Sequence, residues 1–421
     1  EGAAALPVPY LRVEHARHAL ADLAAALSGH PSRRLVTVGI TGTKGKTTTA
    51  WLIRHLLRTG GHTTGLLSTL GYKLEDDALH QFPAHFTTPE APQVQGTLAQ
   101  MVTRGCSHAV IEASSEALAQ DRLRNTHFNI AVWTNLAPEH LNFHGDMEGY
   151  FQAKRILFDA ADFAVLNAAD SWGMRLADRP HTTYADRSRR SAQWWAGDVV
   201  EEGGGLAFVV HHSHGSFSAT LPMIGTYNVA NALAAIATVS HLGVPPRDIQ
   251  MGLAGFPGVP GRMEVLRTTP VRVILDFAHT PDSLRLALTT LRETTAGRLI
   301  AVLGSAGGPR DPGKRAPLGA VAASLADLAI FTEEDCRDTP IEEILNEMKR
   351  GADEATADSY LLIPDRLDAI RHALAHAAPG DTVVFCGKAG EITLERATET
   401  LPWIEEEIVR KVMDDLGWAS T

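Results

Sequence analysis

Apolar and polar positions alternate between two kinds of segment along most of the chain. Short apolar runs of strand length, each ending beside polar residues, occur at 34–40, 108–114, 128–136 and 162–168. Segments with helical spacing of apolar residues lie between these runs. The alternation predicts a mainly parallel sheet covered by helices on both faces. Binding groups are then expected at the carboxyl ends of the strands.

Two segments in the middle of the chain differ from this pattern. Residues 196–221 have short alternating runs broken by Gly and Ser, which predicts an antiparallel hairpin. The Ala-rich run 228–243 predicts a helix that ends at Gly243, before two prolines. The Pro- and Gly-rich stretch 255–264 is the predicted domain boundary.

A second alternation of strands and helices follows this boundary. Its apolar runs lie at 271–278, 298–305, 327–333 and 381–387, and they predict a smaller α/β domain. The acidic stretch 405–415 indicates a helix with a solvated face.

Composition narrows the class of protein. The chain has 421 residues, of which 44% are hydrophobic and 21% charged, as in a globular protein with a large core. Its formal net charge of −11 argues against a general nucleic-acid binder. No apolar run approaches the roughly 20 residues of a membrane span. The three cysteines fit neither a disulfide framework nor a zinc site, so a reducing cytoplasm is expected.

The strongest chemical signal is TGTKGKTT at 41–48, between an apolar run and a helical pattern. Its glycines allow backbone N–H groups to turn toward an anion, Lys46 can reach nucleotide phosphates, and the Thr47 hydroxyl suits Mg²⁺. Ile40 replaces the first glycine of the common P-loop pattern, so this loop is a shorter variant. The predicted phosphate site consists of Gly42, Thr43, Lys44, Gly45, Lys46, Thr47 and Thr48.

Glu112 and His140 follow successive apolar runs in the same manner. Magnesium bound to a triphosphate keeps only one or two protein ligands, and carboxylate oxygens are preferred. Either residue alone is a weak candidate, because a loop histidine is commonly a surface residue. Their shared position after strands makes both candidate metal ligands.

The order of several longer motifs carries a family resemblance. They are GITGTKGKTTTA, FTTPEAP, VIEASSEALAQDRL, WTNLAPEHLNFHGDMEGYFQAKRILF, GTYNVANALAA, GVPGRME, ILDFAHTPDSL and GPRDPGKRAPLG. Over nearly its whole length the chain resembles the Mur ligases. Within that family it is most similar to the members that use ATP to add the third amino acid to UDP-N-acetylmuramoyl-L-Ala-D-Glu.

The resemblance implies an ATP- and Mg²⁺-dependent ligase of peptidoglycan precursor synthesis, acting through an acyl phosphate. The implied fold is a central P-loop-type α/β domain with a mainly parallel sheet and a smaller Rossmann-like α/β domain. The expected divisions are 1–33 for the remnant of a preceding domain and its linker helix, 34–262 for the central ATP-binding domain, and 263–421 for the domain that binds the amino acid. The expected partners are small-molecule substrates, and a monomer is expected.

The resemblance also assigns roles to individual residues. The implied catalytic residues are Lys46, Glu112, His140 and Lys154, with Thr47, Glu112, His140 and a carbamylated Lys154 at the metals. The further ATP contacts are Asn231, Arg262 and Asp276. The acceptor would contact Thr87, Thr88, Ser114 and Arg122, and the amino acid would contact Arg310, Glu334, Asp335, Arg337, Gly387 and Glu391.

The charges of the residues expected to contact the amino acid bear on which amino acid is added. Arg337 would favour a distal carboxylate, whereas Glu334, Asp335 and Glu391 would favour a distal amine. A diamino acid is therefore expected, with diaminopimelate narrowly ahead of lysine or ornithine. The alternative for Arg337 is an ordinary ion pair with Asp335 or Asp338 on a loop.

Some features depart from the family pattern. Glu116 stands where the family usually has His, and Lys44 where it usually has Asn. The segment before the glycine loop is short, so the uridine-binding domain is expected to be truncated or missing from this chain. The alternatives are a Mur-like ligase for another carboxylate (lipid-linked glutamate amidation, cyanophycin or folylpolyglutamate type) or a silent scaffold.

Overall fold

The computed structural model describes residues 12–82, 86–186, 191–308, 312–355 and 359–418. Contacts divide the chain into two units. The first contains Glu1–Val200, Ala207–Leu221 and Thr226–Phe256, and the second contains Glu201–Leu206, Pro222–Gly225 and Pro257–Thr421. The divisions expected from the sequence at residues 33 and 262 stay a prediction.

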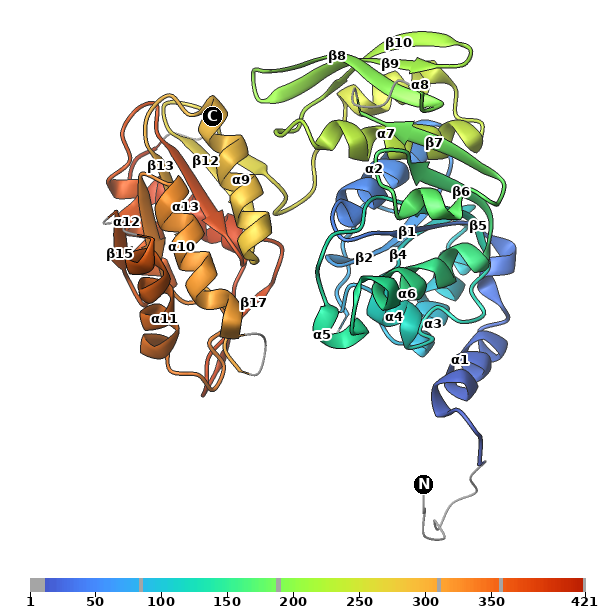
Figure 1. The fold of residues 1–421 in the computed structure, drawn as a ribbon, viewed down its shortest axis with the longest axis horizontal. Coiled ribbons are helices and arrows are strands. Elements are labelled where there is room, and N and C mark those ends of the chain that lie inside the picture. Colours follow the sequence, from blue (N-terminus) through green and yellow to red (C-terminus); the bar gives the residue numbers. More distant parts are fainter. Residues whose placement is uncertain (1–11, 83–85, 187–190, 309–311, 356–358, 419–421) are drawn as a thin grey trace. The chain divides into compact units, whose positions relative to one another are not determined.

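The first unit is built on a ten-stranded sheet (Figure 1). Its strands are β1 (Val36–Thr41), β2 (Thr64–Ser68), β3 (Gly71–Lys73), β4 (His108–Glu112), β5 (Phe128–Trp133), β6 (Ala161–Asn167), β7 (His181–Ala185), β8 (Trp194–Glu202), β9 (Gly205–His212) and β10 (Gly215–Leu221). Their order is β10-β9-β8-β7-β6-β5-β1-β4-β2-β3. The strands from β2 to β8 in this order pair in parallel, and β3 is antiparallel to β2.

Helices cover both faces of this sheet, with α2 and α7 on one face and α3, α4 and α6 on the other (Figure 1). The helices are α1 (Ala16–Leu27), α2 (Lys46–Thr59), α3 (Ala91–Thr103), α4 (Ser115–Ala119), α5 (Leu141–His144), α6 (Met147–Asp159), α7 (Asn228–His241) and α8 (Pro246–Ala254), with short 3-10 turns η1 (Pro31–Arg34) and η2 (Gly173–Leu176). Because helices lie on both faces, burial along β1 and β4 is nearly continuous and does not alternate.

Packing under β1 is close enough to require a glycine. A Cβ atom on Gly39 would lie 2.6 Å from Leu157 of α6 and 2.9 Å from Phe128 of β5. Those two side chains belong to the core between the sheet and helices α3, α4 and α6. The sheet edge formed by the carboxyl ends of β1, β2, β4 and β5 is thereby held in a fixed position, and the candidate site lies there.

The second unit has a six-stranded sheet in the order β11-β12-β16-β13-β14-β15. The strands are β11 (Glu264–Arg267), β12 (Arg272–Asp276), β13 (Leu299–Leu303), β14 (Leu328–Phe331), β15 (Tyr360–Leu362) and β16 (Thr382–Cys386), and β17 (Thr393–Glu395) pairs separately with β18 (Thr400–Pro402). Strand β11 is antiparallel to β12, and the other strands of the six are parallel.

Helices α9, α10 and α11 pack side by side in this unit, and α12 packs against α13. Their bounds are α9 (Pro281–Thr294), α10 (Arg315–Leu325), α11 (Ile341–Glu354), α12 (Arg366–Ala375) and α13 (Glu405–Asp415), with the 3-10 turn η3 (Pro312–Lys314). The acidic stretch 405–415 is a helix as predicted, but the prediction of a solvated face is incomplete. Val409, Val412 and Met413 are buried in the core, and so is Glu405.

The predicted α/β class is confirmed, and the long apolar runs became β1, β4, β5, β6, β12, β13, β14 and β16. The predicted hairpin at 196–221 has a third strand, since β8, β9 and β10 are joined by two short turns. Sequence patterns missed the short strands β2, β3, β7, β11 and β15. No helix in the described part of the chain has both the length and the apolar character to cross a bilayer.

Candidate active site

The glycine loop joins β1 to α2. Gly45 has a φ of 85°, a left-handed conformation that favours glycine, and α2 begins at Lys46. A Cβ on Gly45 would also lie 2.3 Å from Oδ1 of Asn231, so a side chain would not fit there. The first N–H groups of α2, from Lys46 onward, have no carbonyl partner within the helix, and they form the usual cradle for a phosphate.

Lys46 folds back over its own loop. Its Nζ donates hydrogen bonds to the carbonyl oxygens of Gly42 at 3.0 Å and Thr43 at 2.8 Å. The ammonium group is therefore held beside the predicted phosphate cradle. In contrast, the backbone N–H groups of Thr43 and Lys44 donate to Asn135, so these two predicted phosphate donors are engaged within the protein.

Glu112 connects the loop to the neighbouring strands. Its carboxylate is fully buried and accepts hydrogen bonds from the Thr47 hydroxyl at 3.1 Å and from the Thr69 hydroxyl at 3.1 Å. The backbone N–H of Thr69 donates to the other carboxylate oxygen at 3.2 Å. Two of the predicted metal ligands, Thr47 and Glu112, are thus brought together.

The predicted acceptor residues gather at the same end of β4. The Thr87 hydroxyl is 3.2 Å from that of Thr69, and the Thr88 hydroxyl donates to the carbonyl of Glu112 at 2.7 Å. Ser114 N–H donates to the Thr88 hydroxyl at 3.0 Å. Arg122 donates to the carbonyl of Thr88 at 2.9 Å, and its guanidinium pairs with Glu90 at 3.1 Å. Its charge is therefore already compensated in part.

Lys154 lies behind the loop and is completely buried. Its Nζ donates to the carbonyl of Gly42 at 2.8 Å and lies 4.4 Å from the centre of the Tyr150 ring. Burial, reinforced by the nearby charge of Lys46, lowers the pKa of Lys154 well below its ordinary value, and Glu139 opposes this only in part. This shift favours the neutral amine over the ammonium form.

The remaining predicted metal ligand, His140, is placed differently. Its side chain is about half exposed, its Nδ1 lies 3.8 Å from the Glu116 carboxylate, and its ring meets the edge of Tyr150. Among the described residues no group of three or more His, Cys, Asp or Glu side chains is arranged to hold a metal. A site here therefore depends on Thr47, Glu112 and the ligands that a substrate or a modified Lys154 would add.

The predicted nucleotide contacts belong to both units. In the first unit Asn231 lies against Gly45, and its Nδ2 donates to Asn228 at 2.9 Å. In the second unit the half-buried Asp276 carboxylate accepts the N–H groups of Met263 at 2.8 Å and Ala278 at 2.9 Å. Burial raises the pKa of Asp276, and the opposing contributions come from Arg262 and those two N–H groups.

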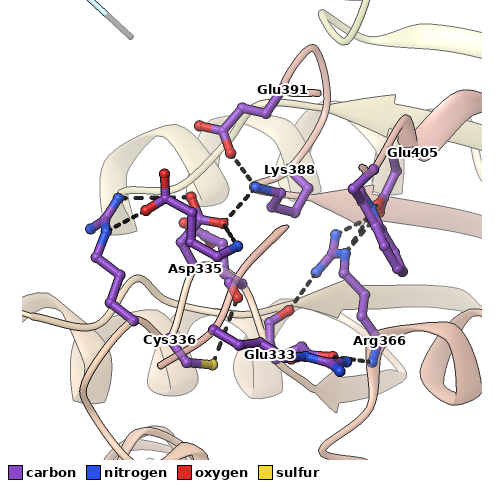
Figure 2. A network of polar contacts seen from close by, with 12 residues as sticks. Glu333, Asp335, Cys336, Arg366, Lys388, Glu391 and Glu405 are labelled. Atoms are coloured by element: carbon purple, nitrogen blue, oxygen red, sulfur yellow. Dashed lines mark hydrogen bonds and ion pairs between the residues drawn. The ribbon is translucent and has the colours of Figure 1, made fainter. Parts of the chain in front are cut away.

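Figure 2 shows a cluster of charged residues in the second unit that contains two of the predicted amino-acid contacts, Asp335 and Glu391. Lys388 is fully buried, and its Nζ donates to Asp335 at 2.8 Å and Glu391 at 2.5 Å. Burial acts to lower the pKa of Lys388, but the two carboxylates outweigh it and raise the pKa. Asp335 and Glu391 therefore already have a cation between them, which the sequence analysis did not foresee.

Glu334 differs from those two acids. It is buried, and its Oε2 has no hydrogen-bond partner. Burial raises the pKa of Glu334, against the influence of Lys314 and Lys388. Gly387 has a φ of 97°, and a Cβ on it would lie 2.5 Å from that same Oε2, so the glycine makes room for the carboxylate.

Arg337 forms ion pairs within its own unit. Its Nε donates to Glu395 at 2.7 Å, and its Nη2 lies 3.8 Å from Asp335. The loop ion pair considered as the alternative is thus present, with Glu395 as the nearer partner. Arg310 lies outside the described residues.

A buried ion pair forms the base of this cluster (Figure 2). Arg366 and Glu405 are both buried, and Nη2 of Arg366 donates to Glu405 at 2.6 Å. Arg366 also donates to the carbonyls of Glu333 at 3.1 Å and Cys386 at 3.0 Å, which follow β14 and end β16. The pair therefore holds two strand ends beneath the predicted amino-acid residues.

Removing one partner of this pair should destabilise the protein strongly. Glu405→Gln leaves the Arg366 guanidinium buried without its counter-charge, and we expect the free energy of unfolding to fall by about 3 kcal/mol. The control is Glu406→Gln, which removes the exposed partner of Arg410 and should cost less than about 1 kcal/mol. Urea denaturation of both variants measures the difference. Equal losses would contradict a special role for the buried pair.

Several residues of the site escaped the sequence analysis. Thr69 directly follows β2 and Asn135 is the second residue after β5, so strand-end position could have identified them. Lys388 lies in the same short motif as Glu391, CGKAGE at 386–391. Its role as a counter-charge depends on its complete burial, which the sequence does not indicate. Glu395 lies far from Arg337 in sequence, and no local pattern indicates their pairing.

Comparisons with known proteins agree along the chain. A family model described as the Mur ligase middle domain matches residues 40–239, and one described as Mur ligase, glutamate ligase domain matches residues 261–389. A UDP-N-acetylmuramyl-tripeptide synthetase of Deinococcus radiodurans is 58% identical over 410 residues, which cover 97% of this chain and 84% of the relative.

Solved structures give the same picture. A UDP-N-acetylmuramoyl-L-alanyl-D-glutamate–2,6-diaminopimelate ligase has a TM-score of 0.64 at 31% identity, covering 91% of this chain and 79% of its own. The fold is also shared with a MurF ligase from Thermotoga maritima in complex with ADP, with a TM-score of 0.67 at 18% identity, covering 98% of this chain and 87% of its own.

Proposed function

The chain belongs to the Mur ligase family of ATP-dependent ligases that form amide bonds, and we propose that it adds a diamino acid to UDP-N-acetylmuramoyl-L-Ala-D-Glu. The similarity to a tripeptide synthetase at 58% identity supports this acceptor. The geometric observation that carries the proposal is the buried Glu112 carboxylate. It joins Thr47 of the phosphate loop to Thr69, which in turn reaches Thr87 of the acceptor group.

The chemistry requires two positioned substrates. A carboxylate is a poor acylating agent, so transfer of a phosphoryl group from ATP turns it into an acyl phosphate that an amine can attack. Lys46 would stabilise charge on the transferred group, and the acceptor carboxylate would lie near Thr87 and Ser114. Mg²⁺, held by Thr47 and Glu112 with phosphate oxygens, would supply further charge neutralisation.

We also propose that Lys154 is carbamylated. Carbamate formation requires a neutral amine, and the burial that lowers the pKa of Lys154 favours that form. The modification would replace a buried amine beside Lys46 with an anion. His140 would then complete the metal environment from its loop.

The structure supports a distal amine on the incoming amino acid. Glu334 is the acid of the cluster whose Oε2 has no hydrogen-bond partner, whereas Asp335 and Glu391 share Lys388. Arg337 is compensated by Glu395, so a second carboxylate gains less from it than the sequence suggested. We therefore propose lysine or ornithine as substrates at least as good as diaminopimelate.

Glu334→Gln should weaken use of the diamino acid. A charge-assisted hydrogen bond contributes about 1.5–3 kcal/mol, so KM for the amino acid should rise roughly ten- to a hundredfold while KM for ATP stays unchanged. The variant should fold, because an uncharged amide of similar size avoids the cost of burying a charged carboxylate. That cost is what raises the pKa of Glu334. Glu342→Gln, an exposed acid on α11, is the control. An unchanged KM for the diamino acid would argue against this role.

One assay tests the proposed function. The protein is incubated with ATP, UDP-muramoyl dipeptide and, separately, lysine, ornithine and diaminopimelate, and the products are identified by mass while ADP release is followed. Amide product with a diamino acid supports the proposal. ADP release that depends on a different carboxylate would move the chain to another Mur-like acceptor.

We also propose a cytoplasmic location. The three cysteines are buried and unpaired, which suits a reducing cytoplasm. The monomeric state expected from the sequence stays a prediction.

A further inference from the structure

The side chain of Asn135 binds the backbone of the glycine loop at two points. Its Oδ1 accepts the N–H of Lys44 at 3.0 Å, and its Nδ2 donates to the carbonyl of Lys44, also at 3.0 Å. The backbone carbonyl of Asn135 accepts the N–H of Thr43 at 2.8 Å. One residue therefore holds both polar groups of Lys44 and the N–H before it.

The preceding residue closes the same contact. The Thr134 hydroxyl donates to the carbonyl of Lys44 at 2.7 Å. A Cβ on Gly42 would lie 1.8 Å from that hydroxyl oxygen and 3.0 Å from the backbone nitrogen of Asn135. The loop thus lies directly on the 134–135 segment, with no room for a side chain between them.

The 134–135 segment is itself anchored from behind. The N–H of Thr134 donates to the carbonyl of Thr41 at 3.0 Å, and Asn167 donates to the carbonyl of Thr134 at 2.8 Å. Asp170 accepts the N–H of Leu136 at 2.9 Å. Asn135 therefore projects from a fixed support at the end of β5, and it can impose a conformation on the loop.

This contact decides which way the loop N–H groups point. Those of Thr43 and Lys44 face Asn135, and the chain then turns at Gly45 into helix α2. A peptide group with both its neighbours fixed needs no reorganisation when an anion arrives, and such preorganisation increases affinity. The N–H groups from Gly45 onward are then the ones that would bind the phosphates.

We propose that Asn135 is a positioning residue for the phosphates of the nucleotide, acting through the Lys44 backbone. The role rests on the proposed nucleotide site and adds to it a residue that does not touch the ligand. It requires an amide, because the side chain must accept from one backbone group and donate to the other. A carboxylate would keep the first bond, face the Lys44 carbonyl with a second acceptor, and add negative charge near the phosphates.

The test compares nucleotide affinity with stability. ADP binding is measured by calorimetry for wild type, Asn135→Ala, Asn135→Asp and the control Asn129→Ala. Asn129 stands near the start of the same strand β5, is also half-buried, and accepts the backbone N–H of Thr37 at 2.9 Å. We expect ADP affinity to fall roughly tenfold for Asn135→Ala and further for Asn135→Asp, with Asn129→Ala within about twofold of wild type.

Steady-state kinetics and melting curves separate positioning from simple loss of structure. KM for ATP should rise in both Asn135 variants while KM for the amino acid is unchanged, and the melting temperatures of Asn135→Ala and Asn129→Ala should be similar. ADP affinity equal to wild type in both Asn135 variants would overturn the role of Asn135 alone. Failure of the wild type to bind ADP would overturn the nucleotide site, and this role with it.

Discussion

Replacing Lys46 with alanine is expected to lower ATP turnover by about a thousandfold or more. The ammonium group is held beside the phosphate cradle by the carbonyls of Gly42 and Thr43, so its charge is already in position before the phosphoryl group moves. Fixed charges of this kind act without reorganisation, and removing a single neutral donor already costs roughly a hundred- to a thousandfold. The loss of a full positive charge should lie at or beyond the upper end of that range.

The measurement is amino-acid-dependent ADP release, with a melting curve to show that the variant is folded. Lys349→Ala is the control, because it removes a lysine from an exposed i,i+4 pair on α11, and it should keep normal turnover. Ordinary turnover in a folded Lys46→Ala protein would rule out the phosphate role of the loop. A variant that binds ADP normally but forms no ADP from ATP would place Lys46 in the chemical step.

Sequence patterns predicted those parts of the fold whose signal is local. The central strands such as β1 contain several apolar residues within a short run, and Gly45 with Lys46 marks the turn into α2. The short strands β2 and β7 lack such runs, because sheet neighbours rather than their own residues define them. Thr69 could have been identified from its position at the end of β2, but this requires that β2 itself be predicted.

Charge pairing was the harder part to predict. The acids Asp335 and Glu391 appear available in the sequence, but the buried Lys388 lies between them. Arg337 appears available for a substrate carboxylate, but Glu395 from β17 reaches it. Each pair depends on a side chain brought in by tertiary structure, so residue type alone gave the right region and an incomplete account of its net charge.

These pairings change what the amino-acid region can select. A carboxylate that already shares a lysine offers little new attraction to a substrate amine, because the first interaction would have to be weakened. Glu334 keeps an unpartnered oxygen in a buried position, where a matching charge has its largest effect. Selection by one carboxylate favours any amino acid with a distal amine of suitable length.

Lys154→Ala is expected to lower turnover about a hundredfold or more, and a small carboxylate such as acetate or formate should restore part of the loss. The reason is the environment of the lysine, which is fully buried, close to Lys46 and bonded to the carbonyl of Gly42. Burial lowers the pKa of Lys154 and so favours the neutral amine that reacts with CO₂, whereas an ordinary surface lysine is mostly protonated near neutral pH.

Two variants separate the carbamate from a simple packing role. Lys154→Arg puts a guanidinium cation in this place and cannot form a stable carbamate, so it should be inactive and should not respond to acetate. Lys46→Ala, which removes the other lysine beside the loop, should also not respond. Full activity of Lys154→Ala without added acid would contradict the proposal.

A readout independent of activity follows from the same chemistry. Wild-type protein incubated with ¹³C-labelled bicarbonate should show a carbamate carbonyl resonance that Lys154→Ala lacks. The resonance should weaken as the pH falls, because acid protonates the amine that must stay neutral to hold CO₂. The depressed pKa of Lys154 means that this loss should begin at a lower pH than for an exposed lysine. A resonance that persists in Lys154→Ala would assign the modification to another lysine, and Lys154 would then act only as a buried donor to the Gly42 carbonyl.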